Sequence, residues 1–186
     1  MLAVVANQLI LINGLPGSGK STLAGPLASA LRVPLIGKDL LKEAMAAAAP
    51  GIPSPAFGIA ASQAMWELAA AAPGGAVLDS WWFKPRDLGF VKAGLDRCGS
   101  PATVEIWCDV PAELAIARYR GRRRAEIHED QRRLTDSWPR WAAEAEPLRV
   151  GRTLMIDTSH PVDLGPLIDQ IRAEGAWPVA GHRGKN

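Results

Sequence analysis

Residues 14–21 of the chain read Gly-Leu-Pro-Gly-Ser-Gly-Lys-Ser, and Thr22 follows. The run fits the pattern G-x-x-x-x-G-K-[ST], in which backbone N–H groups surround a polyphosphate, the Lys reaches the β- and γ-phosphates, and the Ser hydroxyl ligates Mg²⁺. Glycines are needed because such a loop bends through positive φ and brings phosphate oxygens close to the main chain. The apolar run Leu9–Ile12 precedes the loop and a helical stretch, Ser21–Leu31, follows it. This is the strand, loop, helix order that a phosphate loop requires.

The loop therefore predicts a nucleoside triphosphate site, with Mg²⁺ beside the Ser hydroxyl. The residues expected to contact the nucleotide here are Gly14, Leu15, Pro16, Gly17, Ser18, Gly19, Lys20, Ser21 and Thr22.

Short apolar runs alternate with helical periods along the chain. Alternating strands and helices predict an α/β fold with a parallel sheet and helices on both faces. A length of 186 residues suits one domain, 1–186, with a substantial core. The strand candidates are Leu9–Asn13, Pro34–Gly37, Ala76–Ser80, Thr103–Cys108 and Thr153–Asp157.

The composition is that of an ordinary globular protein. A hydrophobic content of 48%, a charged content of 22% and a net charge of +2 argue against a disordered chain or a general polyanion binder. Cys98 and Cys108 match no metal-binding spacing, so free thiols in a reducing cytosol are predicted. The apolar segment Met1–Ile12 lacks a basic region and a cleavage site, so neither a signal peptide nor a membrane span is expected. A cytoplasmic location follows, and the oligomeric state stays open.

Two carboxylates follow predicted strand ends, where α/β nucleotide enzymes keep their chemistry. Asp39 comes after the second strand candidate and can orient or deprotonate a hydroxyl that attacks the γ-phosphate. The alternative is that Asp39 caps the following helix, Leu40–Ala48, and one residue can do both. Asp79 ends the third candidate and resembles a Walker B acid, which would hold Mg²⁺ directly or through water beside Ser21.

Three consecutive aromatic residues, Trp81, Trp82 and Phe83, follow the third strand candidate, and Arg86 is close behind. A loop cannot easily bury three aromatic rings in a core. We therefore expect Trp81, Trp82 and Arg86 to line a pocket for the acceptor substrate. The alternative is a hydrophobic plug beneath the nucleotide-facing loops.

Seven of the fifteen arginines lie within sixteen residues of one another. On a helix, Arg118 and Arg122 would share a face and could converge on one anion. Guanidinium groups suit phosphate, and a mobile lid that carries them could stabilise transferring charge and exclude water. The alternatives are a solvated basic helix face and a nucleic-acid surface, which is less favoured because the rest of the chain carries no matching positive excess. The cluster comprises Arg118, Arg120, Arg122, Arg123, Arg124, Arg132 and Arg133.

Four features together resemble the small P-loop kinases of the AAA_33 type, a group related to chloramphenicol phosphotransferase, gluconate kinase, zeta toxins and polynucleotide kinases. They are the phosphate loop, the Lys-Asp pair at 38–39, an Arg-x-x-x-Arg stretch with a nearby His, and a late strand that ends in Ile-Asp-Thr-Ser at 156–159. The resemblance covers about residues 8–173. It implies a three-layer αβα sandwich with five parallel strands in the order 2-3-1-4-5, ATP with Mg²⁺, and an arginine-rich lid at about 118–137.

The resemblance also implies residue roles. Lys20 and Ser21 would bind phosphate and Mg²⁺, with Asp39 as the base, and Arg118 with Arg122 or Arg124 would act from the lid, Arg124 as an acceptor contact. The segment Asp157–Val162 would lie along the adenine, which makes Thr158 a nucleotide contact. Relatives often carry His-Pro-Gly-His in the lid, whereas Ile-His-Glu-Asp stands at 127–130 here. His128 is accordingly predicted to be a surface residue.

The predicted reaction is ATP-dependent transfer of the γ-phosphoryl group to a hydroxyl of a small molecule, and no membrane partner is expected. One alternative is a kinase for the 5′-hydroxyl of a polynucleotide, which would bind through the lid arginines. The other is a regulatory ATPase that hydrolyses ATP slowly and signals to a partner through lid closure.

Overall fold

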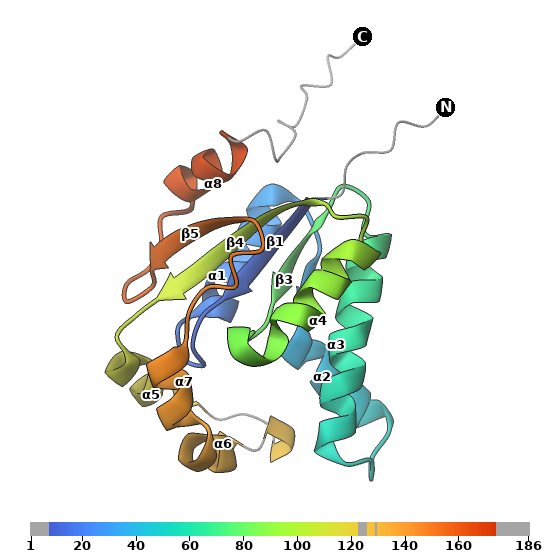
Figure 1. The fold of residues 1–186 in the computed structure, drawn as a ribbon, viewed down its shortest axis with the longest axis vertical. Helices are drawn as coiled ribbons and strands as arrows, with labels where there is room; N and C mark the ends of the chain where they lie inside the picture. Colours follow the sequence, from blue (N-terminus) through green and yellow to red (C-terminus); the bar gives the residue numbers. More distant parts are fainter. Residues whose placement is uncertain (1–7, 123–125, 129, 174–186) are drawn as a thin grey trace.

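A parallel sheet of five strands in the order β2-β3-β1-β4-β5 forms the centre of the computed structural model, which describes residues 8–122, 126–128 and 130–173 (Figure 1). Both the predicted fold class and the predicted strand order are confirmed. Within the described residues, no helix combines the length and the apolar character needed to cross a membrane. The strands are β1 (Gln8–Asn13), β2 (Leu35–Gly37), β3 (Ala76–Asp79), β4 (Ala102–Asp109) and β5 (Arg152–Asp157).

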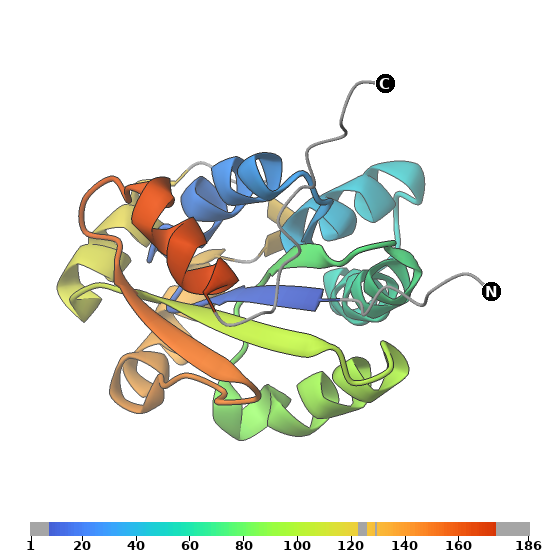
Figure 2. The same cartoon turned by 90° about the horizontal axis from the view of Figure 1, so that it is seen from above.

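Helices cover both faces of the sheet. α1 (Lys20–Leu31) and α8 (Leu164–Arg172) lie on one face, and α3 (Ser54–Ala71) and α4 (Lys84–Arg97) lie on the other (Figure 2). Successive side chains of a strand point to opposite faces, so a strand between two helix layers is apolar throughout. This explains the uninterrupted run Leu9–Ile12 in β1, whose even-numbered residues join the core under α1 and whose odd-numbered residues join the core under α3.

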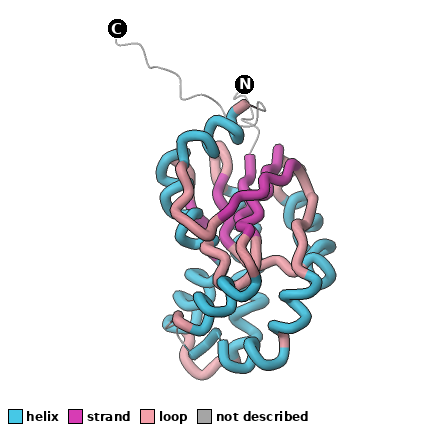
Figure 3. The backbone as a smooth tube through the Cα atoms, turned by 90° about the vertical axis from the view of Figure 1, so that its left-hand side faces the viewer, coloured by secondary structure: helices cyan, strands magenta, loops and turns pink. Residues whose placement is uncertain are grey.

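The remaining helices gather beyond the carboxyl ends of the strands (Figure 3). An apolar cluster between α5 and α7 holds part of this layer together, and it includes Tyr119 and Trp138, whose rings stack at 6.0 Å between centroids. The layer therefore has a core of its own, next to the phosphate loop. Its elements are α2 (Lys38–Ala48), α5 (Ala112–Arg120), the 3₁₀ helix η1 (Glu126–His128), α6 (Asp130–Asp136) and α7 (Trp138–Glu144).

A buried carboxylate links the central strands to the segment that follows α7. Glu105 in β4 is fully buried and accepts hydrogen bonds from the backbone N–H groups of Leu148 (2.9 Å) and Arg149 (2.8 Å). It also accepts one from Asn13 Nδ2 in β1 at 3.0 Å. Since a buried charge is tolerated only when it is well hydrogen-bonded, this arrangement fixes where the chain returns from α7 to the sheet.

Replacement of Glu105 with Ala should lower the free energy of unfolding by about 3 kcal/mol, because it removes the acceptor of the Leu148 and Arg149 N–H groups and one of the two acceptors of Asn13 Nδ2. Urea unfolding followed by tryptophan fluorescence measures the effect. Glu113→Ala, at an exposed position of α5, is the matched control and should change the midpoint little. An unfolding midpoint of Glu105→Ala equal to that of the wild type would contradict this account of the core.

Candidate active site

The phosphate loop joins β1 to α1 in a conformation that only glycine adopts readily. Gly14 and Gly17 have φ of +136° and +89°, in the left-handed region. A Cβ on Gly14 would lie 2.7 Å from the carbonyl oxygen of Cys108, and a Cβ on Gly17 would overlap the carbonyl of Ala115. The loop is thus packed against β4 and α5 by its main chain. This geometry fits a cradle for phosphate oxygens.

Lys20 folds back over the loop that precedes it. Its ammonium donates to the carbonyl oxygens of Gly14 (2.9 Å) and Leu15 (2.8 Å), and the side chain is buried. Burial lowers the pKa of Lys20 to about 8, and the nearby carboxylate of Asp79 opposes that change. The loop therefore holds its cation at the start of α1, where a phosphate would also meet the N–H groups of the helix.

Ser21 and Asp79, the two residues predicted to bind Mg²⁺, lie together. Burial raises the pKa of Asp79, whereas Lys20 and a hydrogen bond from the Ser21 hydroxyl lower it. Among the described residues no group of three or more His, Cys, Asp and Glu side chains could hold a metal ion. A hydroxyl and a carboxylate nevertheless fit Mg²⁺, which keeps several waters and needs only one or two protein ligands beside phosphate.

Asn13, the last residue of β1, orients the start of the loop. Its side-chain oxygen accepts hydrogen bonds from the backbone N–H of Gly14 (2.8 Å) and of Trp82 (3.1 Å). The Trp82 side chain is 2% exposed and packs against the ring of Trp66 in the core. Trp82 is therefore not positioned to touch an acceptor, which corrects that prediction. Phe83 is also buried, so the hydrophobic-plug alternative describes these two aromatic residues.

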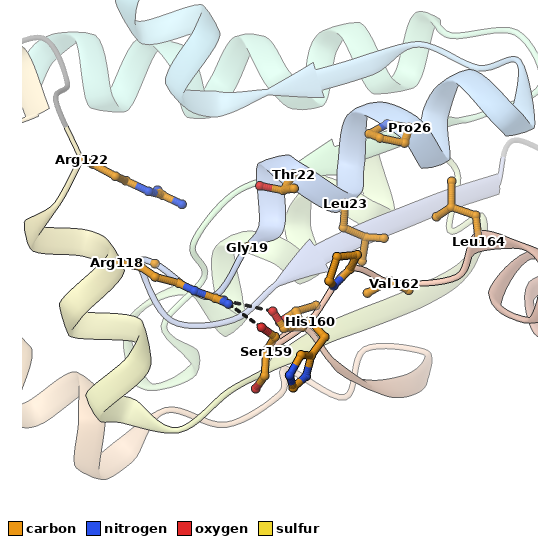
Figure 4. A pocket seen from close by; sticks show the side chains of 13 residues that line it. Gly19, Thr22, Leu23, Pro26, Arg118, Arg122, Ser159, His160, Val162 and Leu164 are labelled. Atoms are coloured by element: carbon orange, nitrogen blue, oxygen red, sulfur yellow. Dashed lines mark hydrogen bonds between the residues drawn. The ribbon is translucent and has the colours of Figure 1, made fainter.

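A first cavity, of about 560 Å³, lies between α1 and the segment that follows β5 (Figure 4). Arg118 of α5 closes one side of it by donating to the carbonyl oxygens of Thr158 (3.0 Å) and Ser159 (2.7 Å). The Thr158 hydroxyl in turn donates to the carbonyl oxygen of Ser18 at 2.6 Å. The wall is largely apolar, as suits a flat organic ring. Its side chains include Thr22, Leu23, Pro26, His160, Val162 and Leu164.

The structure separates the two predicted lid arginines. Arg118 is engaged with the segment after β5, whereas Arg122 extends toward Thr22 with no hydrogen bond or ion pair to any described residue (Figure 4). Arg122 also lines a second cavity beside the first. It is therefore the arginine that lies where the two cavities meet. Arg124, the third candidate, lies outside the described residues.

The second cavity, of about 260 Å³, lies at the carboxyl ends of β2 and β3. It brings together the loop residues Lys20 and Ser21 and both predicted carboxylates, Asp39 and Asp79. Trp81 and Arg86 also line this cavity. The guanidinium of Arg86 is held by the neighbouring carboxylate of Asp87, through two hydrogen bonds of 2.7 Å.

Asp39 lies in the first turn of α2 and is not its N-cap. The helix begins at Lys38, its N-cap is Gly37, and no side chain caps it. The alternative that Asp39 serves as an N-cap is therefore wrong. The carboxylate is 59% exposed at the cavity, with one oxygen 3.7 Å from His128 Nδ1. A carboxylate so placed is open to a molecule in the cavity.

His128 is buried, so its prediction as a surface residue is wrong. Its Nε2 lies 2.6 Å from the carboxylate of Glu43 in α2, and only 1% of the side chain is exposed. Lys42 and Ser54 bind the same segment by donating to the carbonyl oxygen of Ile127, each at 2.6 Å. The 3₁₀ helix η1 is thus docked on α2 and α3. The sequence gives no sign of these contacts, because the partners are 73 to 85 residues apart.

The fold and the phosphate loop define a P-loop protein. The AAA_33 family, described as an AAA domain, matches residues 9–148. Since the match covers most of the chain, the protein belongs to this family. No curated protein matches the chain closely enough to count as a relative.

Solved structures of kinases share the fold. A "putative kinase" from Chloroflexus aurantiacus j-10-fl has a TM-score of 0.70 at 21% identity, over 90% of this chain and 98% of that one. A gluconokinase from Sinorhizobium meliloti 1021 has a TM-score of 0.52 at 21% identity, over 85% of each chain. Shikimate kinase from Acinetobacter baumannii, in complex with shikimate, has a TM-score of 0.53 at 16% identity, over 93% and 97%. These similarities establish the P-loop kinase fold for the chain.

Replacement of His128 with Ala should loosen the segment that carries α6, because it removes the contact with Glu43 and leaves a gap beside α2. We expect amide hydrogen exchange in Asp130–Asp136 to become at least about tenfold faster, as measured by mass spectrometry without nucleotide. His160→Ala, at an exposed histidine, is the control and should leave α6 unchanged. Equal exchange rates in both variants would show that His128 does not hold this segment.

Proposed function

We propose that the protein is an ATP-dependent phosphotransferase that moves the γ-phosphoryl group to a hydroxyl of a small-molecule acceptor. The observation that carries the proposal is the second cavity, where Lys20 and Ser21 of the phosphate loop share one space with Asp39 and Asp79. Phosphoryl transfer requires mainly that donor and acceptor be positioned and that charge be neutralised. A loop for the donor and a carboxylate for the acceptor supply these requirements in one place.

On the donor side, the adenine would lie in the first cavity, along the segment from Thr158 to Val162. The triphosphate would follow the loop from Gly14 to Thr22, with Lys20 at the β- and γ-phosphates. Ser21 and Asp79 would hold Mg²⁺, which when bound neutralises phosphate oxygens. We assign Thr158 and Arg118 to the wall of the nucleotide site, because their mutual contact closes the cavity.

On the acceptor side, Asp39 would orient the hydroxyl and take its proton. The acceptor oxygen forms a bond to the γ-phosphorus while the bond from that phosphorus to the bridging oxygen of ADP breaks. Arg122, at the junction of the two cavities, would offset the charge of the transferring group. We propose that residues 118–137 act as a lid, which brings Arg122 to the phosphates and excludes water.

A small acceptor is supported by the size of the second cavity and by the neighbours that share the fold, which include a gluconokinase and a shikimate kinase. A polynucleotide 5′-hydroxyl kinase and a regulatory ATPase are the competing functions. The three are distinguished by what accelerates release of ADP from ATP.

The test is a screen of ATP turnover with a set of hydroxyl-bearing small molecules, a 5′-hydroxyl oligonucleotide, and no acceptor. We expect slow hydrolysis alone and at least about a hundredfold acceleration by one class of small molecule. Lys20→Ala, which removes the cation of the loop, should show below about 1% of the accelerated rate. Acceleration by the oligonucleotide alone would favour the polynucleotide kinase, and response to a protein partner alone would favour the switch.

In the same assay, Asp39→Asn should lower kcat at least about a hundredfold, because the amide cannot take the proton of the acceptor hydroxyl. Nucleotide affinity, measured by calorimetry with ADP, should stay within about threefold of the wild type, since Asp39 is not part of the donor site. Asp96→Asn, at an exposed position of α4, is the matched control. Unchanged turnover of Asp39→Asn with the true acceptor would contradict the assignment of Asp39 as the base.

A further inference from the structure

Two cations of the second cavity form no ion pair with any residue that the structure describes. Lys38 of α2 and Arg133 of α6 both line it, and the side chain of neither makes a hydrogen bond or ion pair within the described parts of the chain. A third cation, Arg86, is different, since Asp87 holds its guanidinium at 2.7 Å. Among the described residues, no carboxylate is bound to Lys38 or Arg133.

Lys38, Arg133 and Asp39 line the same cavity, and the charges of Arg133 and Asp39 both act on Lys38. Burial lowers the pKa of Lys38, and the charges of Arg86 and Arg133 lower it further, whereas Asp87 and Asp39 raise it. The surroundings of Lys20 differ, because Asp79 and Arg122 act on its pKa, with Asp39 again among the groups that raise it. Asp39 thus lies near both Lys20 of the phosphate loop and Lys38 of α2.

Neutral donors at the same wall are also unsatisfied. The Ser80 hydroxyl and the Trp81 indole N–H are buried, and neither has a hydrogen-bond partner among the residues that the structure describes. Both residues line the second cavity. Buried polar atoms in native proteins are nearly always hydrogen-bonded. Two donors on residues of the cavity lining thus lack an acceptor among the described residues.

We propose that the acceptor carries an anionic group, a carboxylate or a phosphate monoester, which Lys38 and Arg133 bind while its hydroxyl lies at Asp39. The placement of the hydroxyl rests on the proposed function, whereas the anion site rests on the cations themselves. Arginine keeps its charge at all ordinary pH values, so Arg133 cannot relieve the repulsion by losing a proton. A bound anion relieves it and supplies acceptors for several N–H groups.

The neighbour of Arg133 provides a matched control. Arg132 does not line the cavity, its side chain is 74% exposed, and its guanidinium lies 3.5 Å from Asp136. Arg132 and Arg133 carry the same charge on the same helix, but only Arg133 lines the cavity. An effect of general positive charge would be the same at both positions, whereas an effect of the anion site would appear only at Arg133.

Binding is tested by calorimetry on the full chain loaded with ADP and Mg²⁺. The probes are glycerol 3-phosphate, tartrate and gluconate, each paired with an uncharged compound of the same carbon skeleton, namely glycerol, threitol and sorbitol. We expect at least one anion to bind at least about tenfold more tightly than its uncharged partner. If none of the three anions exceeds its partner, the anion site is refuted.

For the anion that binds, Lys38→Gln and Arg133→Gln should each weaken binding at least about tenfold, and Lys38→Arg should restore most of it. Arg132→Gln should stay within about twofold of the wild type. ADP affinity, measured in parallel, shows that each variant is folded. Equal losses in Arg132→Gln and Arg133→Gln would overturn the proposal.

Failure of the anion site and failure of the proposed function give different results. An anion that binds through Lys38 and Arg133 but never receives phosphate from ATP would support the site and contradict the phosphotransferase. Phosphorylation of uncharged compounds alone, with Lys38→Gln as active as the wild type, would support the phosphotransferase and overturn the anion site.

Discussion

The hydrogen bonds around the buried pair Glu105 and Asn13 set the geometry on which the rest of the site depends. Glu105 binds Asn13 and the two N–H groups after α7, and Asn13 binds the first N–H of the phosphate loop and the N–H of Trp82. One buried cluster thus fixes the start of the loop, the chain beyond β3, and the return from the arginine-bearing segment. Because most of these partners are backbone N–H groups, the cluster specifies position as well as stability.

The segment from α5 to α7 is attached to the body at two places by different chemistry. Arg118 holds its beginning to the carbonyls after β5, and the contacts of Ile127 and His128 hold its middle to α2 and α3. Arg122 lies between these two attachments and has neither kind of contact among the described residues. Under the proposed function, Arg122 would move with the transferring phosphoryl group, while Arg118 would keep the wall of the donor site closed.

The fold was predictable because its main determinants are local in the sequence. The sequence pattern of the loop Gly14–Ser21 is typical of a connection between a strand and a helix. The apolar run of β1 requires a helix layer on each face of the sheet. The fate of Trp82 and His128 was not predictable, since both are buried by residues distant in the chain. The role of Asp39 in α2 also needed the structure, because whether a residue caps a helix or follows its cap depends on a shift of one or two positions.

Under the proposed function, the two cavities form one site, with a donor part at the phosphate loop and an acceptor part that includes Lys38 and Arg133. Phosphorus NMR tests it most directly, with ATP, Mg²⁺ and an anionic hydroxyl compound that binds the chain. The account predicts that a new phosphate monoester signal grows as the γ-phosphate signal of ATP is lost. Loss of the γ-phosphate signal with inorganic phosphate as the sole product would contradict it.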